Sequence, residues 1–206
     1  MTLVGCGRAL VGERIAVVDP DTRQRVPPLR VGEIWVCGPN VARGYWRNRE
    51  ATSEAFAAHI AGEDAADWLR TGDLGFFDES GELYITGRIK ELIIIRGMNH
   101  YPQDIENTVQ QCHPALRRHG GAAFAALDGP GSEKLIVVQE VERTHRHRIA
   151  SKDILATIRE AISVEHEIAP DKIVLIRPGT LPKTTSGKIQ RNLARQLWLA
   201  ASLEVL

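Results

Sequence analysis

The segment at residues 181–191 (LPKTTSGKIQR) is the strongest candidate for chemistry in the 206 residues. It is not a phosphate-binding P-loop, because Pro182 stands in place of the first glycine and Ile189 follows Lys188 where that motif has serine or threonine. The polar, glycine-containing segment predicts a loop that presents Lys188 where a helix begins. Such a lysine can reach into a site and neutralise phosphate charge as it builds in a transition state. Taken alone, the simpler interpretation is a solvated lysine beside a helix cap.

Two earlier stretches carry further candidates. In residues 68–75 (WLRTGDLG), Asp73 could hold a ribose, since one carboxylate offers two oxygens to two adjacent hydroxyls. The commoner role of a single aspartate in a tight turn is an Asx-turn or a helix cap. In residues 81–106, Arg88 and Lys90 could equally be two surface cations.

The histidines and cysteines indicate neither a metal site nor a disulfide framework. His100 could belong to a site, although a packed or surface histidine is more common. Five other histidines show no ligand spacing, and we expect them to be structural or exposed: His113, His119, His145, His147 and His166. The three cysteines are odd in number, far apart and without a CxxC pair: Cys6, Cys37 and Cys112. Reduced thiols of this kind are typical of the cytoplasm.

Composition excludes several classes of protein. The 26 basic and 26 acidic residues balance, which argues against nucleic-acid binding through bulk electrostatics. The longest purely apolar run has about four residues (92–95), too few to span a membrane, and the N-terminal residues lack the apolar stretch of a secretory signal. With 43% hydrophobic and 25% charged residues, the chain has the balance of a soluble globular protein.

The first half of the chain is predicted to be rich in β-structure. Short β-branched or aromatic stretches predict strands at residues 14–19, 33–37, 76–77 and 83–85, the last two as a hairpin. Residues 50–60 predict a helix capped by Thr52 or Ser53, with Phe56 and Ile60 on one face.

The second half alternates between strands and helices. Strands are predicted at residues 91–96, 122–127, 134–141 and 172–176. Three helices are predicted, one opened by Pro102, one capped by Ser151 and one near the C-terminus. Their expected buried residues are Ile105, Val109 and Cys112; Ile154, Leu155, Ile158 and Ile162; and Ile189, Leu193 and Leu197. We expect a buried isoleucine-rich strand at 91–96, a turn at 128–131 and a mobile loop at 144–151. Helices on a small sheet give the fold class α+β.

Four motifs in order resemble the adenylate-forming ligase superfamily of acyl-CoA synthetases, peptide-synthetase adenylation domains and luciferases. They are GPNVARGYW, RTGD, GRIKELIIIRG and LPKTTSGK. The segments VGCGRAL, IAVVDPDT, RGMNHYPQDIE, LIVVQEVER and SGKIQRNLARQLW are most similar to fatty acyl-AMP ligases. The resemblance implies that residues 1–87 are the last β-rich subdomain of a large N-terminal adenylation domain. Residues 88–206 would be a small, mobile C-terminal α+β domain with a three-stranded sheet and a hinge near residue 90.

The resemblance also implies a reaction in two halves. A fatty carboxylate attacks the α-phosphate of ATP in the presence of Mg²⁺, giving acyl-AMP and pyrophosphate. The acyl group then passes to the phosphopantetheine thiol of an acyl carrier protein that serves a polyketide or nonribosomal peptide synthase.

Site residues follow from the resemblance by position. Asp73 matches the carboxylate that holds the ribose hydroxyls, and Arg88 the arginine that contacts ribose or phosphate. Lys90 matches the hinge of the small domain. Lys188 matches the lysine that bridges the substrate carboxylate and the α-phosphate during adenylation, a task that suits a point cation on a long stem. We expect no metal ligand in this part of the enzyme.

Two further positions lie in the RGMNHYPQDIE segment. Asn99 stands near the place where some relatives have a polar residue close to the substrate phosphate. Arg96 stands where some relatives use a lysine in the second half-reaction.

The superfamily's earlier motifs are missing: the Ser/Thr/Gly-rich phosphate loop and the segment that contacts adenine and Mg²⁺. We therefore expect the final third of an enzyme, as a truncated gene product, an excised piece or a mis-assigned start. It would be inactive without the N-terminal portion of the same enzyme. Two alternatives stay open. The chain could come from a fatty acyl-CoA synthetase, which uses free coenzyme A. It could also be a non-catalytic module that binds a carrier protein or partner subunit and has no need of Lys188.

Overall fold

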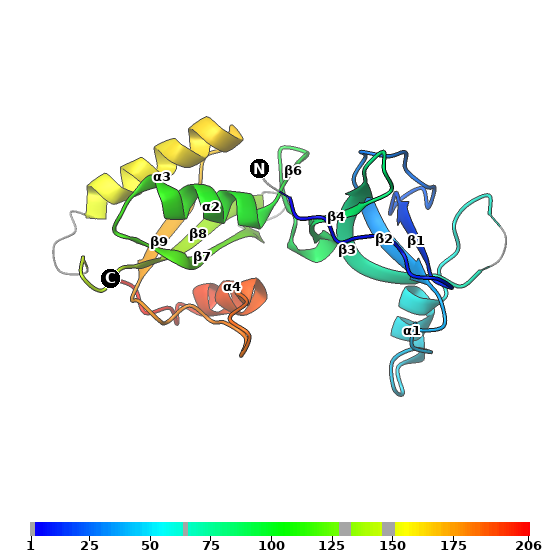
Figure 1. The fold of residues 1–206 in the computed structure, drawn as a ribbon. Helices are drawn as coiled ribbons and strands as arrows, with labels where there is room; N and C mark the ends of the chain where they lie inside the picture. Colours follow the sequence, from blue (N-terminus) through cyan, green and yellow to red (C-terminus); the bar gives the residue numbers. More distant parts are fainter. Residues whose placement is uncertain (1–2, 64–65, 128–132, 146–150) are drawn as a thin grey trace. The chain divides into compact units, whose positions relative to one another are not determined.

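The computed structural model describes residues 3–63, 66–127, 133–145 and 151–206 (Figure 1). The chain divides into two compact units, Met1–Lys90 and Glu91–Leu206. The predicted turn at 128–131 and most of the predicted loop at 144–151 lie outside the described residues.

Unit 1 is built on a four-stranded antiparallel sheet in the order β1-β2-β3-β4. Its strands are β1 (Arg14–Val18), β2 (Gly32–Cys37), β3 (Leu69–Phe77) and β4 (Leu83–Arg88). The predicted strands and the β3–β4 hairpin are confirmed. The strand β3 begins earlier than expected, so the RTGD motif lies inside it rather than in a loop before it.

The helix of unit 1 is displaced from its prediction. Helix α1 spans Arg49–Phe56, and its cap is Asn48, whose Oδ1 accepts a hydrogen bond from the Ala51 N–H at 3.1 Å. The predicted caps are wrong, because Asn48 is itself a strong capping residue one turn earlier. The hydroxyl of Thr52 instead donates to the Asn48 carbonyl at 2.6 Å. Ile60 lies beyond the helix end and is buried in the core of unit 1.

Unit 2 has three layers, with helices on both faces of a three-stranded sheet (Figure 1). Strand β8 (Glu133–Val141) lies between β7 (Leu116–Leu127), which is antiparallel to it, and β9 (Lys172–Ile176), which is parallel. Helices α2 (Pro102–Cys112) and α3 (Ser151–His166) pack on one face of this sheet, and α4 (Arg191–Leu199) packs on the other. The α+β class is therefore confirmed, with the buried faces of α2 and α3 as predicted.

The buried face of α4 differs from the prediction. Ala194 is fully buried and Trp198 packs beside Phe124, with ring centroids 6.2 Å apart, whereas Leu193 is 37% exposed. Residues four apart share a helix face, so the indole of Trp198 and the small Ala194 select this side. Ile189 does pack on this core, but it lies before the helix begins.

The isoleucine-rich segment forms a short hairpin rather than one buried strand. The 3₁₀ turn η1 (Ile89–Glu91) precedes β5 (Ile93–Ile95), which pairs with β6 (Met98–His100). Ile93 is fully buried, but Ile94 is 48% exposed because successive side chains in a strand point to opposite faces. The hairpin turns at Arg96 and Gly97, whose φ angles of 52° and 77° are both left-handed, as a type I′ turn requires.

The last residues of the chain return to the sheet of unit 2. Val205 pairs with Ile176 in an antiparallel bridge. The Leu206 N–H donates to the Leu175 carbonyl and the Arg177 N–H to the Glu204 carbonyl, both at 3.0 Å. This tail covers the C-terminal half of the β9 edge.

Candidate functional site

The site of unit 1 is an exposed ion pair across the β3–β4 hairpin. Asp73 and Arg88 are register partners, and Arg88 Nε lies 2.7 Å from Asp73 Oδ1. The side chains are 38% and 59% exposed, so a ligand can reach both. The structure thus brings together the two residues expected to contact the nucleotide.

A buried carboxylate beneath this pair shapes the strand that carries it. Glu33 is 2% exposed. Its Oε1 accepts from the Gly72 N–H at 3.1 Å, and its Oε2 accepts from Arg70 Nε and Trp35 Nε1, each at 2.9 Å. Gly72 has a φ of 72°, a conformation that favours glycine, immediately before Asp73. Glu33 therefore positions the aspartate. Sequence reasoning missed it, although an acidic residue within an apolar strand was a usable signal.

The site of unit 2 is the turn that carries Lys188. The Gln190 N–H donates to the Pro182 carbonyl at 3.0 Å, and the Thr184 N–H donates to the Lys188 carbonyl at 2.8 Å. Gly187 turns the chain with a φ of 82°. The Lys188 side chain is exposed, and no ion pair to it is formed by any residue that the structure describes. A hydrogen-bonded turn therefore presents an ammonium group that none of the described residues pairs with.

The loop that leads to this turn is anchored by a second buried carboxylate. Glu140 is fully buried, and its Oε1 accepts from the Gly179 and Leu181 N–H groups, both at 2.8 Å. Its Oε2 lies 2.8 Å from Arg117 Nη1. The sequence gives only a weak signal for this role, because Glu140 follows a run of apolar strand residues.

The remaining candidates are Lys90, Arg96 and Asn99, which lie close together in sequence at the boundary of the two units. Lys90 is exposed in η1 and is the last residue of unit 1. Arg96 and Asn99 are exposed on the β5–β6 hairpin of unit 2, where Asn99 pairs with Ile94.

His100 is part of a half-buried group rather than an open site. Its Nε2 is buried and finds no hydrogen-bond partner among the described residues. His166 Nε2 shares a 2.9 Å hydrogen bond with Thr108. Burial lowers the pKa of His100, and the charge of His166 lowers it further. Burial also lowers the pKa of His166, against the opposing charges of Asp104 and Glu165.

Unit 2 is therefore expected to lose stability as the pH falls from 7.5 to 5. His100 and His166 bind fewer protons when folded, so the stability present above their ordinary pKa near 6.5 is lost below it. Burial raises the pKa of Asp104, so this carboxyl takes up protons more readily in the folded state and partly opposes the loss as the pH falls. Thermal unfolding at several pH values between 7.5 and 5 would measure the loss of stability. The double variant His100→Gln/His166→Gln should show a weaker dependence of stability on pH. An equally steep dependence in that variant would contradict the assignment of the effect to these two histidines.

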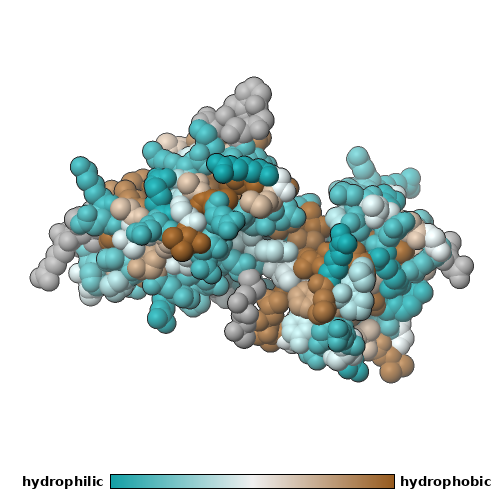
Figure 2. Space-filling model, turned by 90° about the horizontal axis from the view of Figure 1, so that it is seen from above, coloured by the Kyte–Doolittle hydropathy of each residue, from teal (hydrophilic) through white to brown (hydrophobic). Residues whose placement is uncertain are grey.

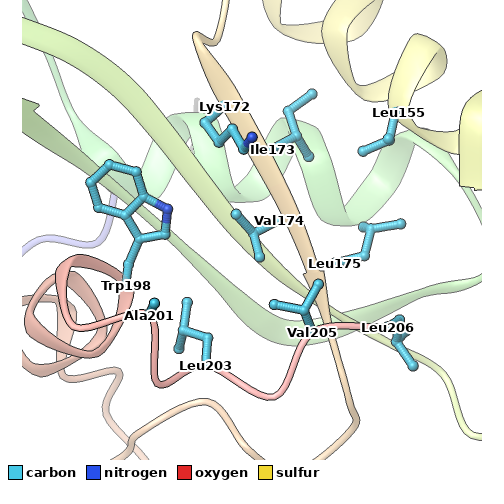
Figure 3. A pocket seen from close by; sticks show the side chains of 10 residues that line it. All are labelled: Leu155, Lys172, Ile173, Val174, Leu175, Trp198, Ala201, Leu203, Val205 and Leu206. Carbon is cyan, nitrogen blue, oxygen red and sulfur yellow. The ribbon is translucent and has the colours of Figure 1, made fainter. Parts of the chain in front are cut away.

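An apolar pocket of about 510 Å³ lies in unit 2 beside β9, away from these residues (Figure 3). Trp198, Val174 and Leu203 line it, and Lys172 is its single charged lining residue. Elsewhere, large apolar side chains reach the surface of unit 1, among them Val4, Val11 and Trp46, and brown apolar residues are visible on the surface in Figure 2.

Membrane-spanning helices, metal-binding clusters and disulfides are absent from the described ranges. No helix there is long and apolar enough to cross a membrane. No group of three or more His, Cys, Asp or Glu there could hold a metal ion. Cys6, Cys37 and Cys112 are free thiols.

Comparisons with known proteins cover both units. Residues 90–206 match the family described as Disco-interacting protein 2-like, AMP domain, and residues 1–46 match the AMP-binding enzyme family. The medium-chain-fatty-acid–[acyl-carrier-protein] ligase JamA of Moorena producens is 48% identical over 202 residues, which are 98% of this chain and 34% of JamA. The 4-hydroxyphenylalkanoate adenylyltransferase of Mycobacterium tuberculosis is 42% identical over 194 residues, 90% of this chain and 30% of that protein.

A solved structure from studies of fatty acyl-adenylate ligases of E. coli and L. pneumophila is also similar. It has a TM-score of 0.78 and 33% identity, over 98% of this chain and 33% of that chain. The chain spans about a third of the length of the curated relatives it matches. The matched families, the ordered motifs and the shared fold lead to one conclusion: the chain belongs to the adenylate-forming superfamily and is of the fatty acyl-AMP ligase type.

Proposed function

We propose that the chain is the C-terminal third of an ATP-dependent fatty acyl-AMP ligase that loads an acyl carrier protein. The observation that carries the proposal is the exposed Lys188 on a hydrogen-bonded turn, where no described residue forms an ion pair with it, in a chain that also holds the accessible Asp73–Arg88 pair. JamA, named for fatty-acid ligation to a carrier protein, supports the choice of substrate and acceptor.

Each site residue has a defined task in this reaction. The Asp73 carboxylate accepts hydrogen bonds from the ribose hydroxyls, and Arg88, which orients it, contacts ribose or phosphate. Lys188 bridges the fatty carboxylate and the α-phosphate, so its charge stabilises the negative charge that grows as the carboxylate oxygen attacks and pyrophosphate leaves. Mg²⁺ would neutralise charge on the phosphates, and none of the residues named here is assigned to hold it.

The second half-reaction needs a different arrangement. We place the hinge at Lys90, with residues 1–87 as the last subdomain of the adenylation domain and 88–206 as the mobile domain. Lys188 then withdraws to admit the phosphopantetheine thiol. Arg96 and Asn99, exposed on their hairpin, are assigned to contacts with substrate phosphate or with the incoming arm.

A chimera tests the proposal. The chain would replace the 202 residues of JamA that match it, and ATP–pyrophosphate exchange would be measured with a medium-chain fatty acid. We expect no exchange from the 206-residue chain alone and restored exchange in the chimera. A folded chimera that carries this chain but does not exchange would contradict the proposal.

The acceptor separates the main proposal from its closest alternative. The chimera would be offered the carrier protein and, separately, free coenzyme A. Preferential loading of the carrier protein supports the acyl-AMP ligase, whereas equal loading of coenzyme A would assign the chain to an acyl-CoA synthetase.

Asp73→Asn in the chimera should weaken ATP binding without unfolding the protein. A hydrogen bond to a charged group is worth about 1.5–3 kcal/mol, so KM for ATP should rise about 10- to 100-fold. The exposed pair with Arg88 contributes only about 0–1 kcal/mol to stability. Steady-state kinetics and thermal unfolding would be compared with Asp21→Asn, a change at an exposed aspartate of the same unit. An unchanged KM would remove Asp73 from the nucleotide site.

A further inference from the structure

We propose that Arg191 is a positioning residue that fixes the Lys188 turn relative to the hinge, so that lysine and hinge move as one body. This inference rests on the proposed function. It concerns three charged residues that the motifs did not single out for chemistry: Arg191, Glu91 and Glu106.

The three side chains form an ion triad inside unit 2. Arg191 donates a hydrogen bond to each oxygen of Glu106, from Nε to Oε1 and from Nη2 to Oε2, both at 2.8 Å. Its third nitrogen, Nη1, donates to Glu91 Oε2 at 2.6 Å. The side chains are 18%, 26% and 9% exposed for Arg191, Glu91 and Glu106. Glu106 also accepts from the Ala123 N–H at 3.0 Å, which fixes the triad to the central sheet.

Local sequence preferences do not explain an arginine at this position. Arg191 is the first residue of α4, where the helix dipole disfavours a cation. The first turn of α4 contains no acidic residue, and the Gln190 side chain makes no capping hydrogen bond within the described part of the chain. Burial alone would lower the pKa of Arg191, but Glu106 and Glu91 outweigh it and raise that pKa. The arginine is therefore held by tertiary partners.

The location of the partners gives the triad its role. Glu91 directly follows the hinge residue Lys90 in sequence, and Arg191 is three residues after Lys188. The other arm of the loop is held by Glu140 through the Gly179 and Leu181 N–H groups. The lysine turn is thus held on one side by the buried Glu140 and on the other by Arg191, which bonds the buried Glu106 and the half-buried Glu91 next to the hinge.

A clamp of this kind matters for one half-reaction only. Lys188 acts in adenylation, and a displacement of about 1 Å in a catalytic group can cost about 10²-fold in rate. Transfer of the acyl group from a ready-made adenylate does not use this lysine. Loosening the triad should therefore slow adenylation selectively, whereas a merely structural role would slow both steps together.

The test uses the JamA chimera with two mild variants, Arg191→Lys and Glu91→Gln. Lysine keeps the charge but cannot form the planar two-pronged contact with Glu106. The matched controls are Arg177→Lys and Glu204→Gln, since these two residues form a surface pair at 3.4 Å with 62% and 59% exposure. Two rates would be measured: pyrophosphate exchange, and loading of the carrier protein from supplied acyl-adenylate.

We expect kcat for adenylation to fall at least tenfold in both variants, with KM for ATP and the loading rate within threefold of the parent. The controls should change neither rate. Equal losses in both half-reactions, or no loss in adenylation, would overturn the inference. Lys188→Ala in the same chimera separates the two proposals. If it leaves adenylation unchanged, the proposed function fails. If it abolishes adenylation while the triad variants are normal, only the positioning role fails.

A second measurement needs no activity. The Lys188 N–H donates to Thr184 Oγ1 at 3.1 Å, so its hydrogen exchange reports the order of the turn in the 206-residue chain. Glu91→Gln should speed this exchange at least tenfold and leave the β7 and β8 amides unchanged, whereas Glu204→Gln should have no effect. Unchanged exchange at Lys188 would overturn the inference.

Discussion

Replacing Lys188 with alanine in the chimera is expected to lower the adenylation rate about 10²- to 10³-fold. Deletion of one preorganised charge stabiliser has an effect of this size, because its contribution is made in the transition state. Lys188 has no ion-pair partner to leave unsatisfied within the described ranges, so the fold should be untouched. ATP–pyrophosphate exchange measures the loss, and thermal unfolding verifies the fold.

Lys152→Ala is the matched control, since Lys152 is an exposed lysine of the same unit on α3. It should leave exchange within twofold of the parent. A drop of less than about threefold for Lys188→Ala would count against this residue as the adenylation lysine. It would favour the alternative of a binding module without catalysis.

Replacing Glu140 with alanine is expected to lower the free energy of unfolding of unit 2 by about 3–5 kcal/mol. The change leaves Arg117 without its carboxylate and removes the acceptor of the Gly179 and Leu181 N–H groups. Urea unfolding followed by circular dichroism at a helical wavelength reports mainly on unit 2, because α2, α3 and α4 lie there.

The control for this prediction is Glu204→Ala, which breaks an exposed ion pair and should cost no more than about 1 kcal/mol. A loss below about 1 kcal/mol for Glu140→Ala would mean that the carboxylate is dispensable as an anchor. The loop before Lys188 would then be held by its own turn alone.

The sequence predicted features that depend on local chemistry. The strands were predicted from β-branched runs. Helix α2 was predicted from the proline at its start, and α3 from the spacing of its isoleucines. The type I′ turn at Arg96 and Gly97 was not predicted, because its signal lies in the backbone angles rather than in a repeating pattern. Asn48 caps α1 one turn before Thr52, the earlier of the two predicted caps.

Contacts between distant residues were beyond sequence reasoning. Glu33, Glu106 and Glu140 are acidic residues on strands or helices, and nothing in their neighbours shows that each meets an arginine 23 to 85 residues away. Asp73 and Arg88 were each identified by motif, but their 2.7 Å contact depends on the register of the β3–β4 hairpin. The motifs therefore identified candidate site residues, whereas the carboxylates that support them became visible only in the fold.

The tail that pairs with β9 has a consequence for self-association. A free sheet edge offers unpaired N–H and C=O groups to which a strand of another molecule can add. Val205 and Leu206 occupy this edge at Ile176 and Leu175. Deleting residues 204–206 would uncover an apolar edge strand next to the pocket of Figure 3, and the shortened protein should form oligomers through strand addition at concentrations where the parent does not.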